Sequence, residues 1–385
     1  MNHQGYEERL RFTRATLRNQ YGLDTTTIDA IEYDPECPFP YNNFVYRVGI
    51  LPNATGLKTQ KLVRPQPGTV ALPQQADHVI MRLSNASAGL NDHNRVENEV
   101  AAMHLARAAL QPMRIVPAVY GWGSASKSQG WILMEYMSGA PLDAILPTLV
   151  YDDKERAIGQ VAAIVRGLQT FELPSTIQGF GGLNFDNEGN IVAAQLTLST
   201  GGPYTTYSEM LTSLLDEQLA KSDSSNIIQA LNNILFDKND FRITAILDFD
   251  WARIGWEGDE CLASFHRAYA RLPPPDEPDD QRAALRTALL KGFPDTLPPA
   301  SPVVDWEVAR IWDEQLAEVR ASRPRTIPRI GAFSTVYALL DLLCPNSLCN
   351  QVIVRQRTEE NMEKEKHAIG ERLGKLLERS VSEIL

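Results

Sequence analysis

The order of expected strands and helices in the first third of the chain most constrains its fold. Two strands come first, and a long excursion at Pro52–Gln75, rich in Pro, Gly, Gln and Thr, leads to a third strand, a helix and two more strands. The strands are short apolar runs, and the helix has apolar residues at helical spacing. We expect strands at Thr27–Tyr33, Phe44–Leu51, His78–Leu83, Ala118–Gly123 and Trp131–Tyr136, the inserted helix at Asn94–Leu110, and an earlier helix at Tyr6–Tyr21.

The rest of the chain is expected to be mainly helical. One hairpin is predicted at Phe180–Gln195, around the turn Asn187–Asn190. Asp152 or Asp153 is expected to cap the first of the helices. These helices are expected at Asp153–Phe171, Tyr207–Leu219, Gln281–Leu290, Asp305–Val319, Ile327–Leu343 and Thr358–Ser382. We therefore expect two domains: residues 1–137, which hold the sheet, and residues 138–385, which hold most of the helices.

A second hairpin brings two polar side chains to its open end. Its strands are expected at Ile234–Phe236 and Ile243–Leu247, with Lys238–Asp240 as the turn. Asn233 comes directly before the first strand, and Asp248 directly after the second. Amide and carboxylate oxygens are hard ligands of the kind that Mg²⁺ prefers. The pattern fits a magnesium site, and it fits an ordinary hairpin with a polar rim equally well.

Composition narrows the class of protein and its partners. Of the 385 residues, 43% are hydrophobic and 22% are charged, which is typical of a globular protein. The formal net charge of −11 argues against nucleic acid or an anionic membrane as a partner, and it is compatible with a cationic small molecule. Neither a transmembrane run nor a secretory signal is recognisable. The four cysteines match no zinc or disulfide pattern, so we expect a reducing, cytoplasmic location.

Four motifs together resemble the fungal branch of the aminoglycoside-phosphotransferase-like, or choline-kinase-like, family. They are Tyr41–Phe44 before a strand, Arg82 on the third strand, Met134–Met137 at the end of the fifth strand, and Asp248–Trp251. The resemblance spans roughly residues 32–354. It implies an α+β, protein-kinase-like fold of two lobes: a small lobe with an antiparallel sheet and a mainly helical large lobe. It also implies ATP and Mg²⁺ as cofactors and a small-molecule hydroxyl as the phosphate acceptor.

The resemblance gives each motif a role. Arg82 would hold the nucleotide phosphates and pair with Glu99, or else with Glu97, although a surface ion pair is the alternative for a strand arginine. The carboxylate of Asp248 could instead cap a turn. Asp250 would position the loop or reach a second metal ion. The implied nucleotide-binding residues are Asn42, Asn43, Arg82, Glu99, Glu135 and Met137, and the implied Mg²⁺ ligands are Asn233 and Asp248.

The catalytic motif of that family is missing. Members carry His-x-Asp ahead of the asparagine ligand, with the aspartate as the base toward the acceptor hydroxyl. Here Asn226 occupies the histidine position, Ile228 occupies the aspartate position five residues before Asn233, and none of the six histidines begins a His-x-Asp. Asp223 lies ten residues before Asn233 and does not fit. Either the catalytic segment was lost or coding sequence was skipped in the gene prediction. The chain is then an impaired phosphotransferase, a non-catalytic nucleotide-binding pseudokinase, or a folded remnant without a ligand.

Overall fold

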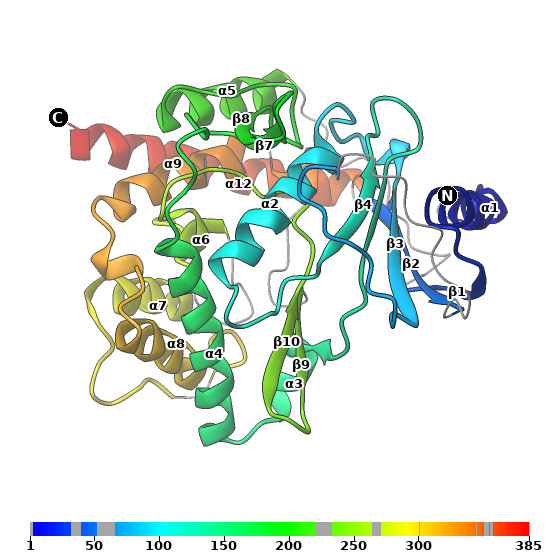
Figure 1. Ribbon diagram of the computed structural model, residues 1–385. Helices are drawn as coiled ribbons and strands as arrows, with labels where there is room; N and C mark the ends of the chain where they lie inside the picture. Colours follow the sequence, from blue (N-terminus) through cyan, green and yellow to red (C-terminus); the bar gives the residue numbers. More distant parts are fainter. Residues whose placement is uncertain are drawn as a thin grey trace. The chain divides into compact units, whose positions relative to one another are not determined.

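A computed structural model divides into two compact units. Figure 1 labels its helices and strands. It describes residues 3–31, 40–51, 66–220, 233–263, 271–299, 301–343, 345–349, 354 and 357–384. The first unit comprises Met1–Ser138, Glu172–Met210 and Thr244–Ile254, and the second comprises Gly139–Phe171, Leu211–Ile243 and Gly255–Leu385. The first break therefore lies one residue beyond the expected boundary at 137, but two later segments belong to the first unit as well.

The first unit is built on a five-stranded sheet in the order β1-β2-β3-β5-β4, in which every neighbouring pair is antiparallel. One face is closed by buried apolar side chains that include Tyr46, Val48, Met81 and Leu133. The strands are β1 (Thr25–Ala30), β2 (Asn43–Ile50), β3 (His78–Ser84), β4 (Val119–Gly123) and β5 (Trp131–Glu135). The predicted α+β class with an antiparallel sheet is confirmed.

Two helices accompany this sheet. The first, α1 (Tyr6–Thr16), continues as a π-helical turn at Leu17–Tyr21. The helix expected at Tyr6–Tyr21 is therefore present, and its last turn is π-helical instead of α-helical. Arg9 of α1 donates a hydrogen bond of 2.9 Å to the Tyr46 hydroxyl. The second, α2 (Arg95–Ala109), is inserted between β3 and β4 as the sequence predicts. Its buried positions include charged and polar residues as well as apolar ones.

Polar side chains of α2 explain why later segments join the first unit. The predicted hairpin forms as β7 (Gly182–Phe185) and β8 (Ile191–Ala194). The side-chain oxygen of Asn98 accepts the Leu183 N–H at 2.6 Å, and its amide nitrogen donates to the Ala252 carbonyl at 2.9 Å. One buried asparagine thus holds both later segments to α2, a long-range contact that no local pattern reveals.

The second unit is mainly helical, as expected. Two of its helices, α4 (Tyr151–Gln169) and α8 (Trp306–Glu318), are linked by a hydrogen bond of 3.4 Å between Gln315 and Glu155. Its described helices are α3 (Leu142–Ile145), α4 (Tyr151–Gln169), α6 (Asp259–Ala263), α7 (Asp280–Lys291), α8 (Trp306–Glu318), α9 (Ile330–Leu343), α10 (Asn346–Cys349) and α12 (Glu359–Ile384). Helix α5 (Tyr207–Ala220) begins in the first unit and continues in the second.

A short sheet completes the second unit. Strands β6 (Ala140–Pro141) and β9 (Ile234–Asp237) pair antiparallel, and β10 (Arg242–Ile246) follows β9 after the predicted turn. Strand β10 carries the chain back into the first unit at Thr244. Asp248, which follows β10, therefore belongs to the first unit, whereas Asn233 belongs to the second.

Some expectations are corrected or fall outside the described residues. The predicted cap by Asp152 or Asp153 is wrong, because α4 begins after Val150 without a side-chain cap and both aspartates lie in its first turn. Asn226, Ile228 and Asp223 lie in 221–232, outside the described residues, as do parts of the first strand and of the excursion before β3. Over the described ranges, none of the helices has the length and apolar character that a membrane crossing requires.

Candidate functional site

The guanidinium of Arg82 is the centre of the candidate site. Its Nη1 lies 2.5 Å from a Glu99 oxygen, and its Nη2 lies 2.8 Å from Asp248 Oδ1 and 2.7 Å from Asp250 Oδ2. The predicted pair of Arg82 with Glu99 is therefore present, and Glu97 is not among the three carboxylates that contact this guanidinium. Arg82 is nearly buried, so the surface ion pair considered from the sequence is excluded.

The guanidinium and its three carboxylates come from β3, α2 and the segment after β10. Arg82 lies on β3, opposite Val45 of β2 and Ile132 of β5, while Glu99 lies on a buried face of α2. Asp248 follows β10, whose Ile246 N–H donates to the Ile115 carbonyl at 2.7 Å. The backbone of Asp248 has a φ of 63°, a left-handed conformation that aspartate tolerates better than most residues.

Asp250 is held from a second side by Asn43. The Asn43 amide donates to Asp250 Oδ2 at 2.6 Å, and its side-chain oxygen accepts from Arg95 at 3.2 Å. Arg95 is fully buried and also donates to the Asn42 carbonyl at 2.6 Å. Because its Oδ2 already bonds both Asn43 and Arg82, Asp250 fits the loop-positioning role better than that of a second metal ligand.

Asn42 and Asn43 therefore lie beside the group formed by Arg82, Glu99, Asp248 and Asp250, which we call the Arg82 cluster. The sequence did not single out Arg95 or Asn98, although both organise the same region. The available signal was polar residues, Asn94, Arg95 and Asn98, within a helix otherwise expected to pack through apolar side chains. Buried polar groups need partners, so such a pattern indicates long-range hydrogen bonds without naming them.

The site holds more negative than positive charge. Glu99, Asp248 and Asp250 surround Arg82, and Arg95 is the next guanidinium, joined through Asn43. Burial raises the pKa of Glu99, and Arg82 only partly opposes that rise. Burial likewise raises the pKa of Asp250, against the effect of Arg82. Burial acts to lower the pKa of Arg82, but Asp250, Glu99 and Asp248 outweigh it and the pKa rises. A proton or a cation would relieve this imbalance.

Asp248 fits a carboxylate that binds a metal ion together with the phosphates of a nucleotide. Its side chain is 41% exposed, whereas that of Asp250 is 4% exposed, so Asp248 alone presents an accessible carboxylate. Within the described ranges, no group of three or more His, Cys, Asp and Glu side chains could hold a metal ion. Mg²⁺ usually retains several waters and takes one or two carboxylates together with substrate phosphates. The residues thus fit Mg²⁺ that arrives with a nucleotide rather than a resident ion.

Glu135, one of the implied nucleotide-binding residues, is the last residue of β5. The Glu135 N–H donates to the Ala118 carbonyl at 2.8 Å, and Glu135 Oε2 accepts the Ala118 N–H at 3.0 Å. Both groups are therefore used within the first unit. Hydrogen bonds to a base would come from other backbone groups of the segment that ends at Met137.

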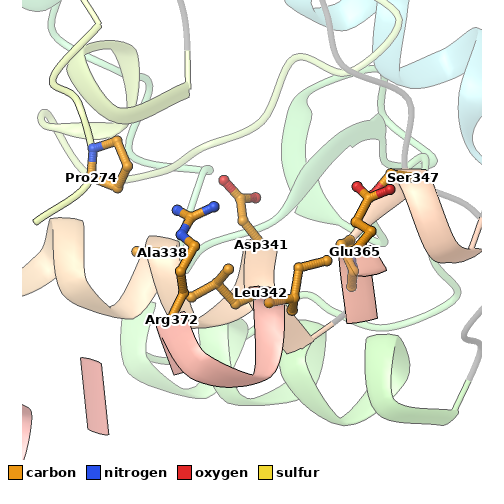
Figure 2. A pocket seen from close by; sticks show the side chains of 9 residues that line it. Pro274, Ala338, Asp341, Leu342, Ser347, Glu365 and Arg372 are labelled. Carbon is orange, nitrogen blue, oxygen red and sulfur yellow. The ribbon is translucent and has the colours of Figure 1, made fainter. Parts of the chain in front are cut away.

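A separate cavity lies in the second unit (Figure 2). It has a volume of about 220 Å³ and lies between α9 and α12. The charged side chains that line it have partners: Asp341 lies 3.2 Å from Arg271, Arg372 lies 2.7 Å from Asp276, and Glu365 contacts Arg357. This cavity therefore offers no uncompensated carboxylate to a cationic ligand.

Comparison with known proteins gives structural likenesses only. No family model and no curated protein matches the sequence. A thermostable mutant of aminoglycoside phosphotransferase APH(4)-Ia, in a ternary complex with ADP and hygromycin B, is 15% identical, with 95% of this chain and 98% of that chain covered and a TM-score of 0.42. ADP-bound aminoglycoside phosphotransferase APH(2'')-Ib is 10% identical, with 94% and 95% covered and a TM-score of 0.38.

A third solved structure is aminoglycoside phosphotransferase APH(3'')-Id from Streptomyces rimosus. It is 14% identical, the alignment covers 81% of this chain and 99% of that chain, and the TM-score is 0.32. At such low identities and TM-scores the likenesses assign no role to any residue. The function of the site rests on the geometry of this chain.

Proposed function

We propose that the chain is an ATP- and Mg²⁺-binding small-molecule phosphotransferase of the aminoglycoside-phosphotransferase type, with an impaired catalytic step. The observation that carries this proposal is the contact of one basic residue on the third strand with both an acid on the inserted helix and the acid that follows β10. Protein kinases pair a lysine on that strand with a glutamate on that helix and use an aspartate to hold Mg²⁺. Arg82 takes the place of the lysine here, with a larger and always charged side chain.

Each residue of the cluster then has a separate task. Glu99 and the buried Asp250 fix the Arg82 guanidinium in place. Asp248 occupies one donor of that guanidinium and exposes its carboxylate, so it can exchange Arg82 for Mg²⁺ and free the donor for a phosphate oxygen. Asn233, the other Mg²⁺ ligand implied by the resemblance, belongs to the second unit and takes no part in this argument. The carboxylate of Asp248 would hold Mg²⁺, which would supply positive charge against the negative charge of the nucleotide phosphates.

The proposed acceptor is a small hydroxylated amine. The net charge of −11 would favour a cationic molecule, although the paired ions of the cavity at Asp341 add nothing to this choice. Ile228 has no group that accepts a proton. A positioned base contributes about 10²–10⁴ in rate, so we expect slow turnover.

A non-catalytic, nucleotide-binding pseudokinase is the second candidate. The specific observation in its favour is that Nη1 and Nη2 of Arg82 both already bond carboxylates. A nucleotide would have to compete with Asp248 for this guanidinium, which favours weak binding. The two candidates differ in turnover and not in their nucleotide site.

The deciding experiment measures binding and turnover on the same protein. Mg²⁺–ATP at millimolar concentration should raise the melting temperature, because a ligand that binds only the native state stabilises it. Asp248→Asn should abolish most of the Mg²⁺-dependent part of that shift. An unchanged wild-type melting temperature would exclude both candidates.

Turnover of ATP against a panel of hydroxylated amines then separates the two candidates. Slow transfer supports the impaired enzyme, and binding without transfer supports the pseudokinase. Ile228→Asp alone should not restore fast turnover, since Asn226 still stands at the histidine position, whereas a reinserted His-x-Asp segment should. Fast turnover by the unaltered chain would contradict the impairment and would point to Asp223 or Asp250 as the base.

A further inference from the structure

Asn98 is a fully buried asparagine at a junction of three segments of the first unit. The segments are helix α2, which carries Asn98, the start of strand β7, and the chain that follows Asp250. The Asn98 side-chain oxygen accepts the Leu183 N–H at 2.6 Å. Its amide nitrogen donates to the Ala252 carbonyl at 2.9 Å and lies 3.5 Å from the Asp250 carbonyl oxygen. Aspartate would lack the donor and leucine would lack both groups, so this pair of contacts selects an asparagine.

The three segments are closely packed at this junction. A Cβ atom at Gly182 would lie 3.0 Å from the Asn98 side-chain oxygen and closer still to the Gln195 carbonyl oxygen, so glycine is needed there. Beside it, Gly181 and Ile254 form an antiparallel bridge with backbone hydrogen bonds of 3.1 and 2.7 Å. The chain that leads to this bridge is therefore attached to the β7 hairpin directly and to α2 through Asn98.

Asp248 and Asp250 lie on a short connection between β10 and the junction. Its first end is fixed because Ile246, the last residue of β10, bonds the chain that precedes β4. Its second end is fixed because the Ala252 carbonyl accepts from Asn98. A shift of Asn98 would therefore move the end of this connection and, with it, the Asp248 carboxylate.

Helix α2 holds both sides of the ion pair between Arg82 and Asp248. Glu99, the residue after Asn98, contacts the Arg82 guanidinium. Neighbouring residues of a helix point about 100° apart, so α2 presents one side chain to this guanidinium and the other to the connection that carries Asp248. Because both are attached to one helix, their separation, 2.8 Å here, is set by α2.

Resting on the function proposed above, we infer that Asn98 is a positioning residue of the nucleotide site. It holds the connection that carries Asp248, and it thereby sets how well this carboxylate binds Mg²⁺ beside the nucleotide phosphates. Asn98 itself contacts neither the ion nor the nucleotide, because backbone groups already use its oxygen and its nitrogen. Its loss should therefore weaken the Mg²⁺-dependent part of ATP binding and spare the Mg²⁺-independent part.

Asn94 offers a matched control on the same helix. It lies one turn before Asn98 and is nearly as buried. Its amide nitrogen donates to the Gln195 carbonyl at 2.5 Å, and its side-chain oxygen accepts from Asn184 at 2.7 Å. Both contacts lead to the β7–β8 hairpin and the residue after it, and neither leads to the connection that carries Asp248. Asn94→Ala thus removes a buried amide from α2 without touching that connection.

Calorimetric titration with ATP, in Mg²⁺ and in EDTA, tests this role. The measured quantity is the Mg²⁺ enhancement, the ratio of the ATP dissociation constant in EDTA to that in Mg²⁺. Asn98→Ala should lower this enhancement by about 3- to 10-fold, the size of one net hydrogen bond, and should change the constant in EDTA by less than about twofold. Asn94→Ala should leave both values unchanged, although each variant should lower the melting temperature.

The failure of this role and the failure of the proposed function give different results. An unchanged Mg²⁺ enhancement in Asn98→Ala, or an equal fall in Asn94→Ala, would overturn the role of Asn98 and leave the proposed function standing. A wild-type protein without any Mg²⁺ enhancement would overturn both. Should Asn98→Ala fail to fold, Asn98→Ser takes its place, because its hydroxyl can serve one of the two backbone groups, with Asn94→Ser as the control.

Hydrogen exchange without nucleotide tests the positioning directly. Asn98→Ala should speed the exchange of the Ala252 and Ile254 amides, whose hydrogen bonds close the end of the connection and the bridge to the hairpin. Asn94→Ala controls for a general loss of stability and should speed these two amides less. Equal exchange in the wild-type protein and in Asn98→Ala would show that the backbone bridge alone holds the connection, and would overturn the role of Asn98.

Discussion

Two buried ion clusters in the molecule are opposite in composition. In the first unit, one guanidinium, that of Arg82, contacts three carboxylates. In the second unit, one carboxylate, that of Asp313, contacts two guanidiniums, Arg323 at 3.0 Å and Arg325 at 2.7 Å. The first cluster has an excess of negative charge, and the second has an excess of positive charge.

The clusters also differ in how far apart their residues lie in the sequence and in how exposed they are. Arg325 follows Asp313 by 12 residues, so that cluster joins α8 to the turn that comes next. Arg82 and Asp248 are 166 residues apart. The exposed member of the first cluster is the carboxylate of Asp248, with a side chain that is 41% exposed. We interpret the Asp313 cluster as a local structural link and the Arg82 cluster as a binding site.

Loss of Arg82 should have the largest effect on stability. Arg82→Met leaves Glu99 and Asp250 buried beside each other without their shared counter-ion, and we expect the free energy of unfolding to fall by about 3–5 kcal/mol at pH 8. The loss should be smaller at pH 5, where a proton can bind between these acids. Urea denaturation measures both values, with the exposed Arg18→Met as a control that should leave stability unchanged. Equal losses at both pH values would contradict the predicted charge imbalance.

Removal of the charge of Asp313 should cause the second largest loss in the free energy of unfolding. Asp313→Asn leaves two arginines without a carboxylate, but the side chain of Arg325 is 32% exposed and water can solvate part of its charge. We expect a loss of about 2–3 kcal/mol in urea denaturation. The shift in melting temperature caused by Mg²⁺–ATP should remain, since the Asp313 cluster is interpreted as structural. Loss of that shift would contradict the interpretation of the Asp313 cluster as structural and of the Arg82 cluster as the binding site.

The third largest expected effect is on how the free energy of unfolding depends on pH, and Glu99→Gln should change that dependence. Burial raises the pKa of Glu99 above its ordinary value of 4.5, so the native state binds a proton that the unfolded state releases. The contribution of this group to stability therefore falls as pH rises from 4.5 through the folded pKa, by at most about 1.4 kcal/mol per pH unit.

A comparison with glutamine isolates this contribution. Glutamine resembles the protonated acid, so Glu99→Gln should become progressively less destabilising between pH 5 and pH 8. Unfolding free energies of both proteins at four pH values give the difference. A difference that stays constant over this range would show that Glu99 is ionised in the native state throughout.

Asp248→Asn should have the smallest effect on stability without a ligand. Its carboxylate is 41% exposed and belongs to a cluster with excess negative charge, so its loss should change the free energy of unfolding by less than about 1 kcal/mol. Urea denaturation without Mg²⁺ or nucleotide is the measurement. A large loss would mean that Asp248 is a structural member of the cluster, like Asp313.

The sequence by itself determined the local elements and one ion pair. Apolar periodicity placed the strands around His78–Leu83 and the helix at Asn94–Leu110 within one or two residues, because these patterns reflect which face of an element is buried. The resemblance carried by the sequence motifs also implied Glu99, or else Glu97, as the partner of Arg82, and the structure has the contact with Glu99.

Only the tertiary structure decided which distant residues complete the cluster. Asn43 and Asp250 are 207 residues apart, and their hydrogen bond depends on how the chain returns to α2 through Asn98. The same contacts assign residues 172–210 and 244–254 to the first unit, which the expected boundary at 137 missed. Local propensity acts over a few residues, whereas the pairing of buried polar groups is satisfied over the whole unit. The roles of Asp250 and Arg95 follow from that pairing, and no local pattern contains it.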